Sequence, residues 1–283
     1  MSAEFLAPAK VNLSLRVIGR RDDGFHEVET LMVPVRGLSD RLRFTAADEF
    51  SLECTEPGVP VDESNLVTKA VRVFQAATGR ACRFRIELEK SIPHGAGLGG
   101  GSSDAAATLR ALDSLEATRL GTRRLAELAG DLGSDVPFFV FDQACWCRGR
   151  GELVEPATCR ISRPIVLLKP SFGVATPDAY SRWRGAAELP GISYAPQHLD
   201  GLTLFNDLER PVFAKHVFLA EVKLWLAAQP GVAAALMSGS GSTMFAILDD
   251  PATAHDLICR ARLELDPTLW AGHFLLSTHP AHS

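Results

Sequence analysis

Apolar and polar residues alternate over residues 5–18, where Val11, Leu13 and Leu15 are separated by Asn12 and Ser14. A period of two residues is typical of a strand with one buried and one polar face. Similar alternation, or a short apolar run, predicts further strands elsewhere in the chain. These strands are expected over residues 27–35, 42–53, 84–88, 136–140 and 164–170, and as a pair around a Ser/Gly turn within 235–248.

A helical period replaces the alternation over residues 65–78, where Leu66, Ala70 and Phe74 fall on one side. Gly79 follows as a candidate C-cap. Further helices are predicted over residues 122–129, over 212–228, and directly after the glycine-rich run that ends at residue 101. Strands and helices therefore mix along the chain, and the pattern predicts an α/β fold of the α+β kind.

A polar link over residues 155–163 is the best candidate for a domain boundary, because apolar segments lie on both sides of it. We therefore expect an N-terminal domain over residues 1–157 and a C-terminal domain over residues 158–283. By length alone, a chain of 283 residues could form one large domain or two, and it can bury a sizeable core.

The most informative stretch is IELEKSIPHGAGLGGGSSDAAATLRAL, residues 86–112, where a strand leads through a glycine-rich loop into a helix. Ser102, Ser103 and Asp104 are expected to supply the N-cap and first turn of that helix. A helix start presents free N–H groups and a positive dipole to an anion, and glycines let phosphate oxygens approach the main chain. The predicted phosphate-binding residues are Pro93, Gly95, Gly97, Leu98, Gly99, Gly100, Gly101, Ser102 and Ser103.

This loop differs from the two most familiar nucleotide-binding patterns. A Walker A loop ends in Gly-Lys-Ser/Thr, whereas Gly101 is followed by Ser102. Gly95, Gly97 and Gly100 fit the spacing G-x-G-x-x-G, but no acidic residue closes the next strand about twenty positions later, as a dinucleotide site requires. A tight connection without a ligand is the simpler alternative for the loop taken alone.

The charge and composition argue against several classes of partner. The net charge is −5 and the pI is about 5.9, so we expect neither nucleic acid nor anionic membranes as partners. Residues 1–10 lack the features of a signal peptide, and no apolar run reaches the length of a membrane span, so a cytoplasmic protein is expected. The six cysteines lack the spacing of a metal or redox pair and are expected to be buried free thiols.

Four polar features lie at predicted turns and strand ends. Lys10 and Asn12 share one face of the first strand, Asp135 follows a glycine turn, and Phe25 and His26 leave an Asp-Gly turn together. The turn over residues 239–242 could add N–H donors around the same anion as the glycine loop. Taken singly, each feature has a simpler explanation: a solvated lysine, a capping aspartate, packing beside a surface histidine, or a plain hairpin.

Taken in order, three segments resemble the motifs of the GHMP kinases, which phosphorylate galactose, homoserine, mevalonate and related alcohols. The segments are Pro8-Ala-Lys-Val-Asn-Leu13, Pro93 to Ser103, and Gly239-Ser-Gly-Ser242. Within this superfamily, Gly24-Phe-His26, GLGGGSSDAA and LGSDVPFF (residues 132–139) are similar to members whose substrate carries a cytidine diphosphate group. The resemblance extends from Pro8 to about Ile247.

The resemblance implies a two-domain fold with a ribosomal-S5-like N-terminal domain and a ferredoxin-like C-terminal domain. It implies ATP against the glycine loop, Asp135 as general base for the substrate hydroxyl, and Lys10 as the group that holds that hydroxyl and stabilises the transferred phosphate. Lys90 and Asn65 become candidates for the adenine side. Mg²⁺ is expected from the reaction class, and its protein ligands stay unassigned because Ser103 and Asp104, the nearest oxygen donors, could be simple caps.

The resemblance also implies a small-molecule partner with a cytidine diphosphate moiety, bound by a monomer or homodimer. Phe25 and Tyr180 would stack on the cytosine, where the family more usually has tyrosine at the first position, and His26 would bind its polar edge. Asn12, Thr176 and Pro177 would line the same site. Two alternatives remain: a GHMP kinase for a small alcohol such as homoserine or mevalonate, and a non-catalytic S5-like module.

Overall fold

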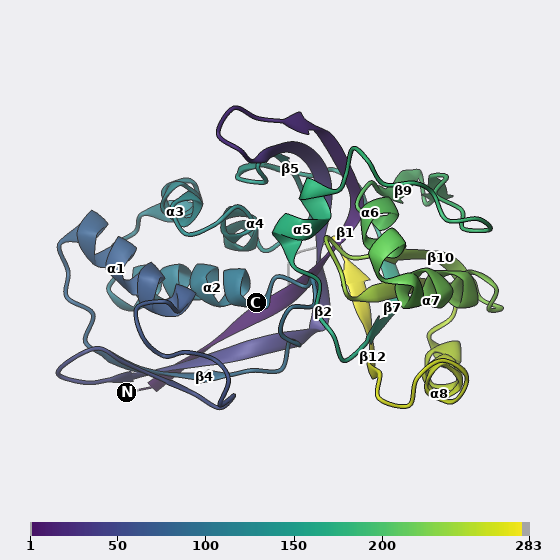
Figure 1. Cartoon of the computed structure of the whole chain (residues 1–283). Coiled ribbons are helices and arrows are strands. Elements are labelled where there is room, and N and C mark those ends of the chain that lie inside the picture. Colours follow the sequence, from purple (N-terminus) through teal and green to yellow (C-terminus); the bar gives the residue numbers. More distant parts are fainter. Residues whose placement is uncertain (1, 279–283) are drawn as a thin grey trace.

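Two long antiparallel strands, β1 (Ser2–Arg20) and β2 (His26–Ala46), run through the middle of the molecule. The computed structural model describes residues 2–278. Figure 1 shows these two strands in purple, with the helices of the N-terminal half on one side and those of the C-terminal half on the other. The tight turn after Arg20 is stabilised by Asp23, whose Oδ1 accepts the Phe25 N–H at 3.1 Å. This turn confirms the predicted hairpin.

All strands of the described chain belong to one sheet system, whose main path runs β10-β11-β7-β12-β2-β1-β9-β8. Strands β3 to β6 pair along β2 or along each other, and β1 joins β9 in parallel. The remaining strands are β3 (Ser51–Cys54), β4 (Phe84–Glu89), β5 (Cys145–Gly149), β6 (Leu153–Pro156), β7 (Ser162–Lys169), β8 (Gln197–Leu199), β9 (Leu202–Asn206), β10 (Val232–Met237), β11 (Met244–Leu248) and β12 (Trp270–Ser277).

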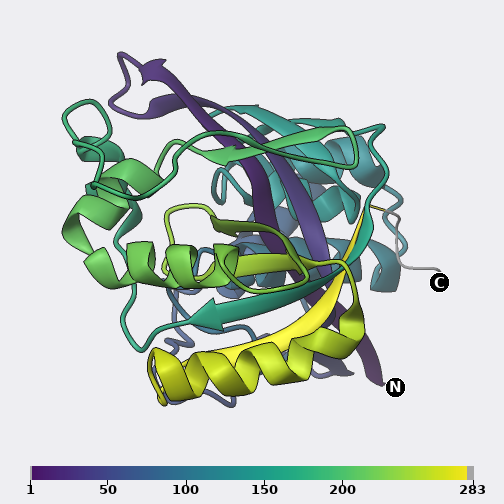
Figure 2. The same ribbon diagram turned by 90° about the vertical axis from the view of Figure 1, so that its right-hand side faces the viewer.

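Helices cover the sheet in two groups that follow the order of the chain. The first group packs on the N-terminal half: α1 (Leu66–Thr78), α2 (Gly100–Leu115), α3 (Gly121–Gly130) and α4 (Val136–Phe141). The second group packs on the C-terminal half: α5 (Thr176–Ser181), α6 (Glu209–Lys215), α7 (Val217–Ala227) and α8 (Ala254–Glu264). In the turned view of Figure 2, α8 lies in front of β12 and β7.

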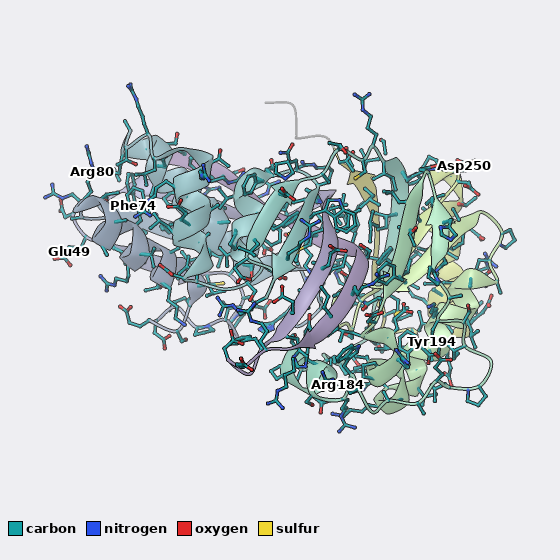
Figure 3. All side chains as sticks on the ribbon, turned by 90° about the horizontal axis from the view of Figure 1, so that it is seen from above. Glu49, Phe74, Arg80, Arg184, Tyr194 and Asp250 are labelled. Atoms are coloured by element: carbon teal, nitrogen blue, oxygen red, sulfur yellow. The ribbon has the colours of Figure 1, made fainter. Side chains whose placement is uncertain are left out.

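Each group of helices closes a core of its own. Phe44, Phe74 and Phe138 are fully buried between the sheet and the first group, and Phe74 is labelled in that half of the molecule in Figure 3. Phe213 and Leu226 are buried in the second group. Because apolar burial is the main favourable term in folding, these two cores hold the halves on either side of the central strands.

Several predicted elements are confirmed by the structure. Helix α1 begins after Asn65, whose side chain accepts the Val67 N–H, and ends at Gly79 in the left-handed conformation. The hairpin of β10 and β11 is also present around the Ser/Gly turn. The strand expected over 27–35 and the first part of that expected over 42–53 form one continuous strand, β2. The other predicted strands and helices are observed with small shifts of their ends, apart from the four differences described next.

Four local predictions are wrong. The strand expected over residues 42–53 is broken at exposed Asp48 and Glu49, so its two parts pair with opposite edges of β4. The apolar run after Asp135 forms the short helix α4, with Pro137 in its first turn and every side chain of 136–140 buried. The helix expected over 212–228 divides at His216 into α6 and α7. Helix α2 begins after Gly99 without a side-chain cap, so the serines after the loop are not N-caps.

A buried ion pair links the helices of the C-terminal half to its strands. Glu209 and Lys223 are 2% and 6% exposed, their side chains contact each other, and Glu209 Oε1 also accepts the Met237 N–H at 2.9 Å. Burial raises the pKa of Glu209, while Lys223 opposes that shift. The pair therefore holds α6 and α7 against the end of β10, where the turn over residues 238–242 begins.

We expect Lys223→Met to lower the Tm by about 10 °C, since removing one partner leaves a buried charge unpaired, at a cost of about 3–5 kcal/mol. Lys215→Met is the matched control, because Lys215 forms an exposed pair with Asp178 at 3.0 Å. That control is expected to stay within about 2 °C of the parent chain. Thermal unfolding followed by circular dichroism measures both, and equal Tm values for the two variants would contradict the prediction.

Candidate active site

The glycine loop is packed so closely that side chains are excluded at two of its positions. Gly97 and Gly99 have φ values of +73° and +74°. A Cβ on Gly97 would overlap the carbonyl oxygen of Ser238, and one on Gly99 would lie 2.6 Å from Phe139 Cζ. The loop is thus wedged between the turn after β10 and helix α4, and glycine is required for both conformation and space.

A cavity of about 430 Å³ lies along this loop and is called the loop cavity here. Its wall includes the predicted residues Asn65, Lys90, Pro93, Gly95, Gly97, Leu98, Gly99, Gly100, Gly101 and Ser102. Ser103 is 1% exposed and does not line the cavity. The N-terminus of α2 points its free N–H groups toward this region, which is an arrangement that favours an anion.

Lys10 and Asp135 meet at one end of the loop cavity. Lys10 is 3% exposed, and its Nζ lies 2.6 Å from Asn12 Oδ1 and 3.5 Å from Asp135 Oδ2. Asn12 Nδ2 in turn donates to Thr30 Oγ1 at 2.8 Å, so neighbouring strands fix the orientation of the amide. A buried ammonium beside a half-exposed carboxylate can hold an anionic group and accept a proton from a neighbouring hydroxyl.

A second cavity of about 650 Å³, called the aromatic cavity here, is lined by Phe25, His26, Pro177, Tyr180 and Trp183. The His26 ring lies 5.1 Å from the Tyr180 ring and 6.3 Å from the Trp183 ring, between centroids. Burial, with the charges of Arg20 and Arg184, lowers the pKa of His26. Figure 3 labels Arg184 close to the end of the β1–β2 hairpin.

The two cavities meet at Asp135, the predicted general base. Asp135, Arg150, Thr176 and Tyr180 line both of them. Helix α5 carries Thr176 and Tyr180 from the C-terminal half against the hairpin of the N-terminal half (Figure 1). An extended molecule could therefore lie in the aromatic cavity with one end beside Asp135 and Lys10, facing a second molecule held along the glycine loop.

Comparisons with known proteins identify the family. The models of the GHMP kinase N-terminal and C-terminal domains match residues 65–143 and 197–265. A 4-diphosphocytidyl-2-C-methyl-D-erythritol kinase from Methylacidiphilum infernorum is 41% identical over 93% of this chain and 93% of its own length. The chain belongs to the 4-diphosphocytidyl-2-C-methyl-D-erythritol kinase family of GHMP kinases. Its enzymatic class follows: it is an ATP-dependent kinase.

Further relatives agree with this assignment. A kinase of the same name from Protochlamydia amoebophila is 38% identical over 87% of this chain and 84% of its own length. A crystal structure of 4-(cytidine 5′-diphospho)-2C-methyl-D-erythritol kinase superposes with a TM-score of 0.80 at 37% identity, covering 98% of this chain and 100% of that one. Homoserine kinase from Cytophaga hutchinsonii, with a TM-score of 0.70 at 17% identity over 98% and 95% of the two chains, shares the fold.

The fold prediction is thereby confirmed, while the predicted domain boundary stays a prediction. Residues 157 and 158 fall between the two matched ranges. Residue 1 and residues 279–283, at the outer ends of the two predicted domains, lie outside the described residues. No helix among residues 2–278 is long and apolar enough to cross a membrane.

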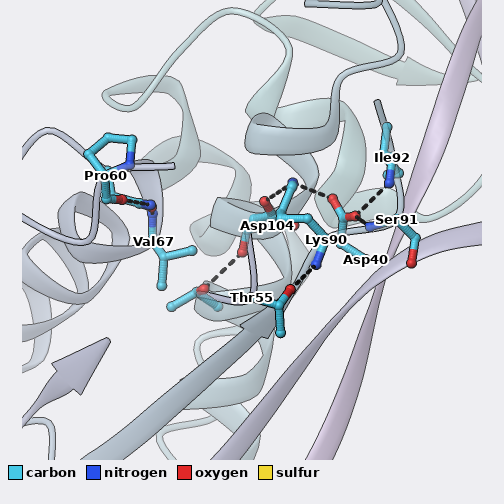
Figure 4. Close-up of polar contacts among 10 residues, drawn as sticks. Asp40, Thr55, Pro60, Val67, Lys90, Ser91, Ile92 and Asp104 are labelled. Carbon is cyan, nitrogen blue, oxygen red and sulfur yellow. Dashed lines mark hydrogen bonds and ion pairs between the residues drawn. The ribbon is translucent and has the colours of Figure 1, made fainter. Parts of the chain in front are cut away.

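The candidate adenine-side residues of the kinase are both engaged by protein atoms (Figure 4). Asn65 caps α1 through its Oδ1 and donates from Nδ2 to the Pro60 carbonyl at 2.6 Å. Lys90 contacts two buried carboxylates, those of Asp40 and of Asp104 at 2.6 Å. Burial acts to lower the pKa of Lys90, but these carboxylates outweigh it and raise that pKa. Lys90 is therefore a cation at neutral pH.

The residues that flank the third motif of the kinase form hydrogen bonds to the glycine loop. Ser238 Oγ donates to the Gly97 carbonyl at 3.0 Å, and the Thr243 N–H donates to the Ala96 carbonyl at 3.2 Å. Ser240 Oγ lies 2.8 Å from Thr176 Oγ1 and lines the loop cavity. The expected meeting of the two turns is therefore present, and it closes the cavity from the C-terminal half.

Several residues of the site gave no specific sequence signal. Thr30 holds Asn12, Arg150 lines both cavities and lies 5.0 Å over the Phe25 ring, and Trp183 borders His26. The polar glycine turn of residues 148–152 was the one available hint for Arg150. Asp40 lies between two predicted strands, so nothing in the sequence separates it from a surface aspartate.

The thiols of the kinase are free, and only some are buried as expected. Cys82, Cys145 and Cys147 are buried, and burial raises the pKa of Cys82 to about 11 and that of Cys145 to about 12. Cys54 and Cys159 are half-buried, and Cys259 is exposed, so the expectation of burial is wrong for Cys259.

Proposed function

We propose that this kinase transfers the γ-phosphoryl group of ATP to the 2-hydroxyl of 4-diphosphocytidyl-2-C-methyl-D-erythritol, in the non-mevalonate route to isoprenoid precursors. The observation that carries the proposal is the meeting of an aromatic cavity and a glycine-loop cavity at Asp135. The related kinases, which are named for this substrate, support the same assignment. ATP would occupy the loop cavity, with Asn65 and Lys90 on its adenine side.

In this proposal Asp135 is the general base and Lys10 the electrostatic partner. The substrate hydroxyl loses its proton to Asp135 as its oxygen bonds to the γ-phosphorus, while the bond to the bridging β-phosphate oxygen breaks and ADP leaves. Lys10 Nζ, 3.5 Å from Asp135 Oδ2, orients the hydroxyl and balances the charge on the transferred group. Phosphoryl transfer depends mainly on positioning and charge neutralisation, which these two groups supply.

The aromatic cavity would hold the cytidine. Phe25 and Tyr180 supply two ring faces for the cytosine, and Asn12, Thr176 and Pro177 lie along the path to the reaction centre. Stacking requires only the π face, so the phenyl ring of Phe25 serves where a tyrosine would add a hydroxyl. Burial raises the pKa of the Tyr180 phenol, and the nearby charge of Asp135 adds to the shift. The phenol is therefore neutral.

His26 is expected to make binding of the cytidyl substrate dependent on pH. A neutral imidazole has one acceptor nitrogen, which can receive the N4 amino group of cytosine, whereas imidazolium has none. Because the pKa of His26 lies below its ordinary value of 6.5, the neutral form dominates at pH 7. KM for the cytidyl substrate should be constant from pH 8 to 7 and rise as the pH falls through this lowered pKa.

Steady-state kinetics across this pH range, with KM for ATP followed in parallel, provide the measurement. His26→Gln keeps an acceptor without titrating, so its KM should lose the acid-side rise. A rise of equal size in the His26→Gln variant would assign the effect to another group and contradict the prediction.

Mg²⁺ fits the chemistry at the start of α2. Asp104 lines the loop cavity, and its Oδ1, like Ser103 Oγ, has no hydrogen-bond partner within residues 2–278. No group of three or more His, Cys, Asp or Glu residues forms a metal cluster within the same range. Mg²⁺ commonly uses one or two carboxylates together with substrate phosphates, so Asp104, which lines the cavity, is the residue that would hold it. When bound, the ion neutralises charge on the β- and γ-phosphates.

The competing function is phosphorylation of a small alcohol such as homoserine or mevalonate. The decisive experiment measures ADP release with ATP and Mg²⁺ on 4-diphosphocytidyl-2-C-methyl-D-erythritol, homoserine and mevalonate in parallel. Turnover of the cytidyl substrate alone is expected. Turnover of a small alcohol instead would retain the kinase and reject the role of the aromatic cavity, since a small alcohol has no base to stack there.

A further inference from the structure

Asp40 lies beneath the glycine loop and is fully buried, with an exposed fraction of 0%. It belongs to β2, at the point where β1 and β2 shift register between Pro8 and Ala9. A carboxylate in such a position is costly unless each oxygen has a partner, and both of them have one. Figure 4 shows the contacts that surround it.

The two carboxylate oxygens of Asp40 have different partners. Oδ1 accepts the backbone N–H groups of Ser91 and Ile92, at 2.6 and 2.8 Å. These residues connect β4 to the glycine loop, so this oxygen fixes the direction in which the chain enters the loop. Oδ2 pairs with the Lys90 ammonium and would lie 3.3 Å from a Cβ on Gly100. Asp40 therefore binds the entry of the loop and lies beside Gly100, where the loop leads into α2.

Lys90 is held in turn by three elements. Its backbone N–H donates to Thr55 Oγ1 at 3.2 Å, and its Nζ pairs with Asp40 of β2 and with Asp104 of α2. An ammonium has three hydrogens, and two of them are used by these carboxylates. Because Lys90 also lines the loop cavity, the third hydrogen is available to a nucleotide there.

We propose that Asp40 is a positioning residue for nucleotide binding, which sets the entry of the glycine loop through Ser91 and Ile92 and orients Lys90 toward the loop cavity. The inference rests on the proposed ATP site in that cavity. Asp40 does not line the cavity itself, so its effect on ATP passes through the loop and through Lys90. A small displacement of the loop should lower the affinity for ATP strongly, because phosphate binding depends on several N–H donors being aligned at once.

The test measures the Kd of ATP and, separately, of the cytidyl substrate by calorimetry. Asp40→Ala should raise the Kd of ATP about tenfold to a hundredfold and leave that of the cytidyl substrate within about twofold. Asp40→Asn keeps the volume and one carbonyl oxygen but turns an NH₂ group toward Lys90, so its Kd for ATP should lie between the parent and Asp40→Ala. Asp48→Ala, an exposed aspartate in the turn after β2, is the matched control and should match the parent.

Two further measurements separate positioning from simple stabilisation. Hydrogen exchange at the amides of Ser91 and Ile92 should accelerate in Asp40→Ala without ligand, since their acceptor is lost. Asp40→Asn and Lys90→Met should be non-additive in ATP affinity, because one acts through the other.

The possible failures are distinguishable. A lower Tm with an unchanged Kd for ATP in both Asp40 variants would overturn the inference and leave the ATP site intact. An equal loss of affinity for both ligands would also overturn it. Gly97→Ala alters the glycine loop itself and therefore tests the ATP site. If the parent binds ATP and this variant binds it equally well, the proposed ATP site is wrong, and the proposed role of Asp40 is wrong as well.

Discussion

Replacing Asp135 with asparagine is expected to lower kcat by about a hundredfold to ten-thousandfold, the usual contribution of a positioned general base. Asparagine keeps the size and the contact with Lys10 but cannot take the hydroxyl proton. Asp135 lies at the junction of the two cavities, and the glycine loop that would hold ATP is unchanged in this variant, so KM for ATP should change by less than about threefold. Steady-state measurement of ADP release against each substrate separates the two parameters.

Asp131→Asn is the control for this variant, because Asp131 is an exposed aspartate four residues earlier in the chain. It should retain the parent kcat. Full activity in Asp135→Asn at neutral pH would remove Asp135 from the mechanism, since the phosphoryl group would then reach the hydroxyl without that carboxylate as base. Loss of activity together with weaker ATP binding would instead point to a disturbed loop cavity.

Gly97→Ala is expected to abolish measurable ATP binding while leaving a folded protein. The added Cβ would overlap the Ser238 carbonyl oxygen and approach that of Gly241 to 2.9 Å, at a φ of +73° that alanine rarely adopts. Relief of this overlap requires the loop to separate from the turn after β10. The N–H groups that face the phosphates would then lose their alignment, and the affinity for ATP should fall by at least about a hundredfold.

Calorimetric titration with ATP measures this effect, and circular dichroism reports whether the fold persists. Gly130→Ala is the control, because a Cβ on Gly130 at the end of α3 meets no atom within 4 Å. Its affinity for ATP should equal that of the parent. An unchanged affinity in folded Gly97→Ala would show that the loop does not bind the nucleotide.

Local rules predicted much of the architecture because their causes are local. The helical period of residues 65–78 needs only one buried face, and Gly79 forms the C-cap as expected, while the N-cap Asn65 was not predicted as a cap. The failures came where neighbouring segments override the pattern. The run after Asp135 became a helix because all of its side chains are buried among other elements, where a period of two carries no information. The break at His216 separates α6 from α7, whose apolar segments together predict one continuous helix.

The sequence by itself determined the glycine loop and the order of the three motifs, since each motif depends on residue types at short spacing. The candidate pair of Lys10 and Asp135 followed from the resemblance of these motifs to the GHMP kinases. Tertiary structure alone decided the rest. It brought Asp40, Lys90 and Asp104 together from three elements, placed α5 against the hairpin, and joined the two cavities at Asp135. Such contacts join residues far apart in the chain, and their energies depend on burial and distance, which arise only when the sheet and its helices pack.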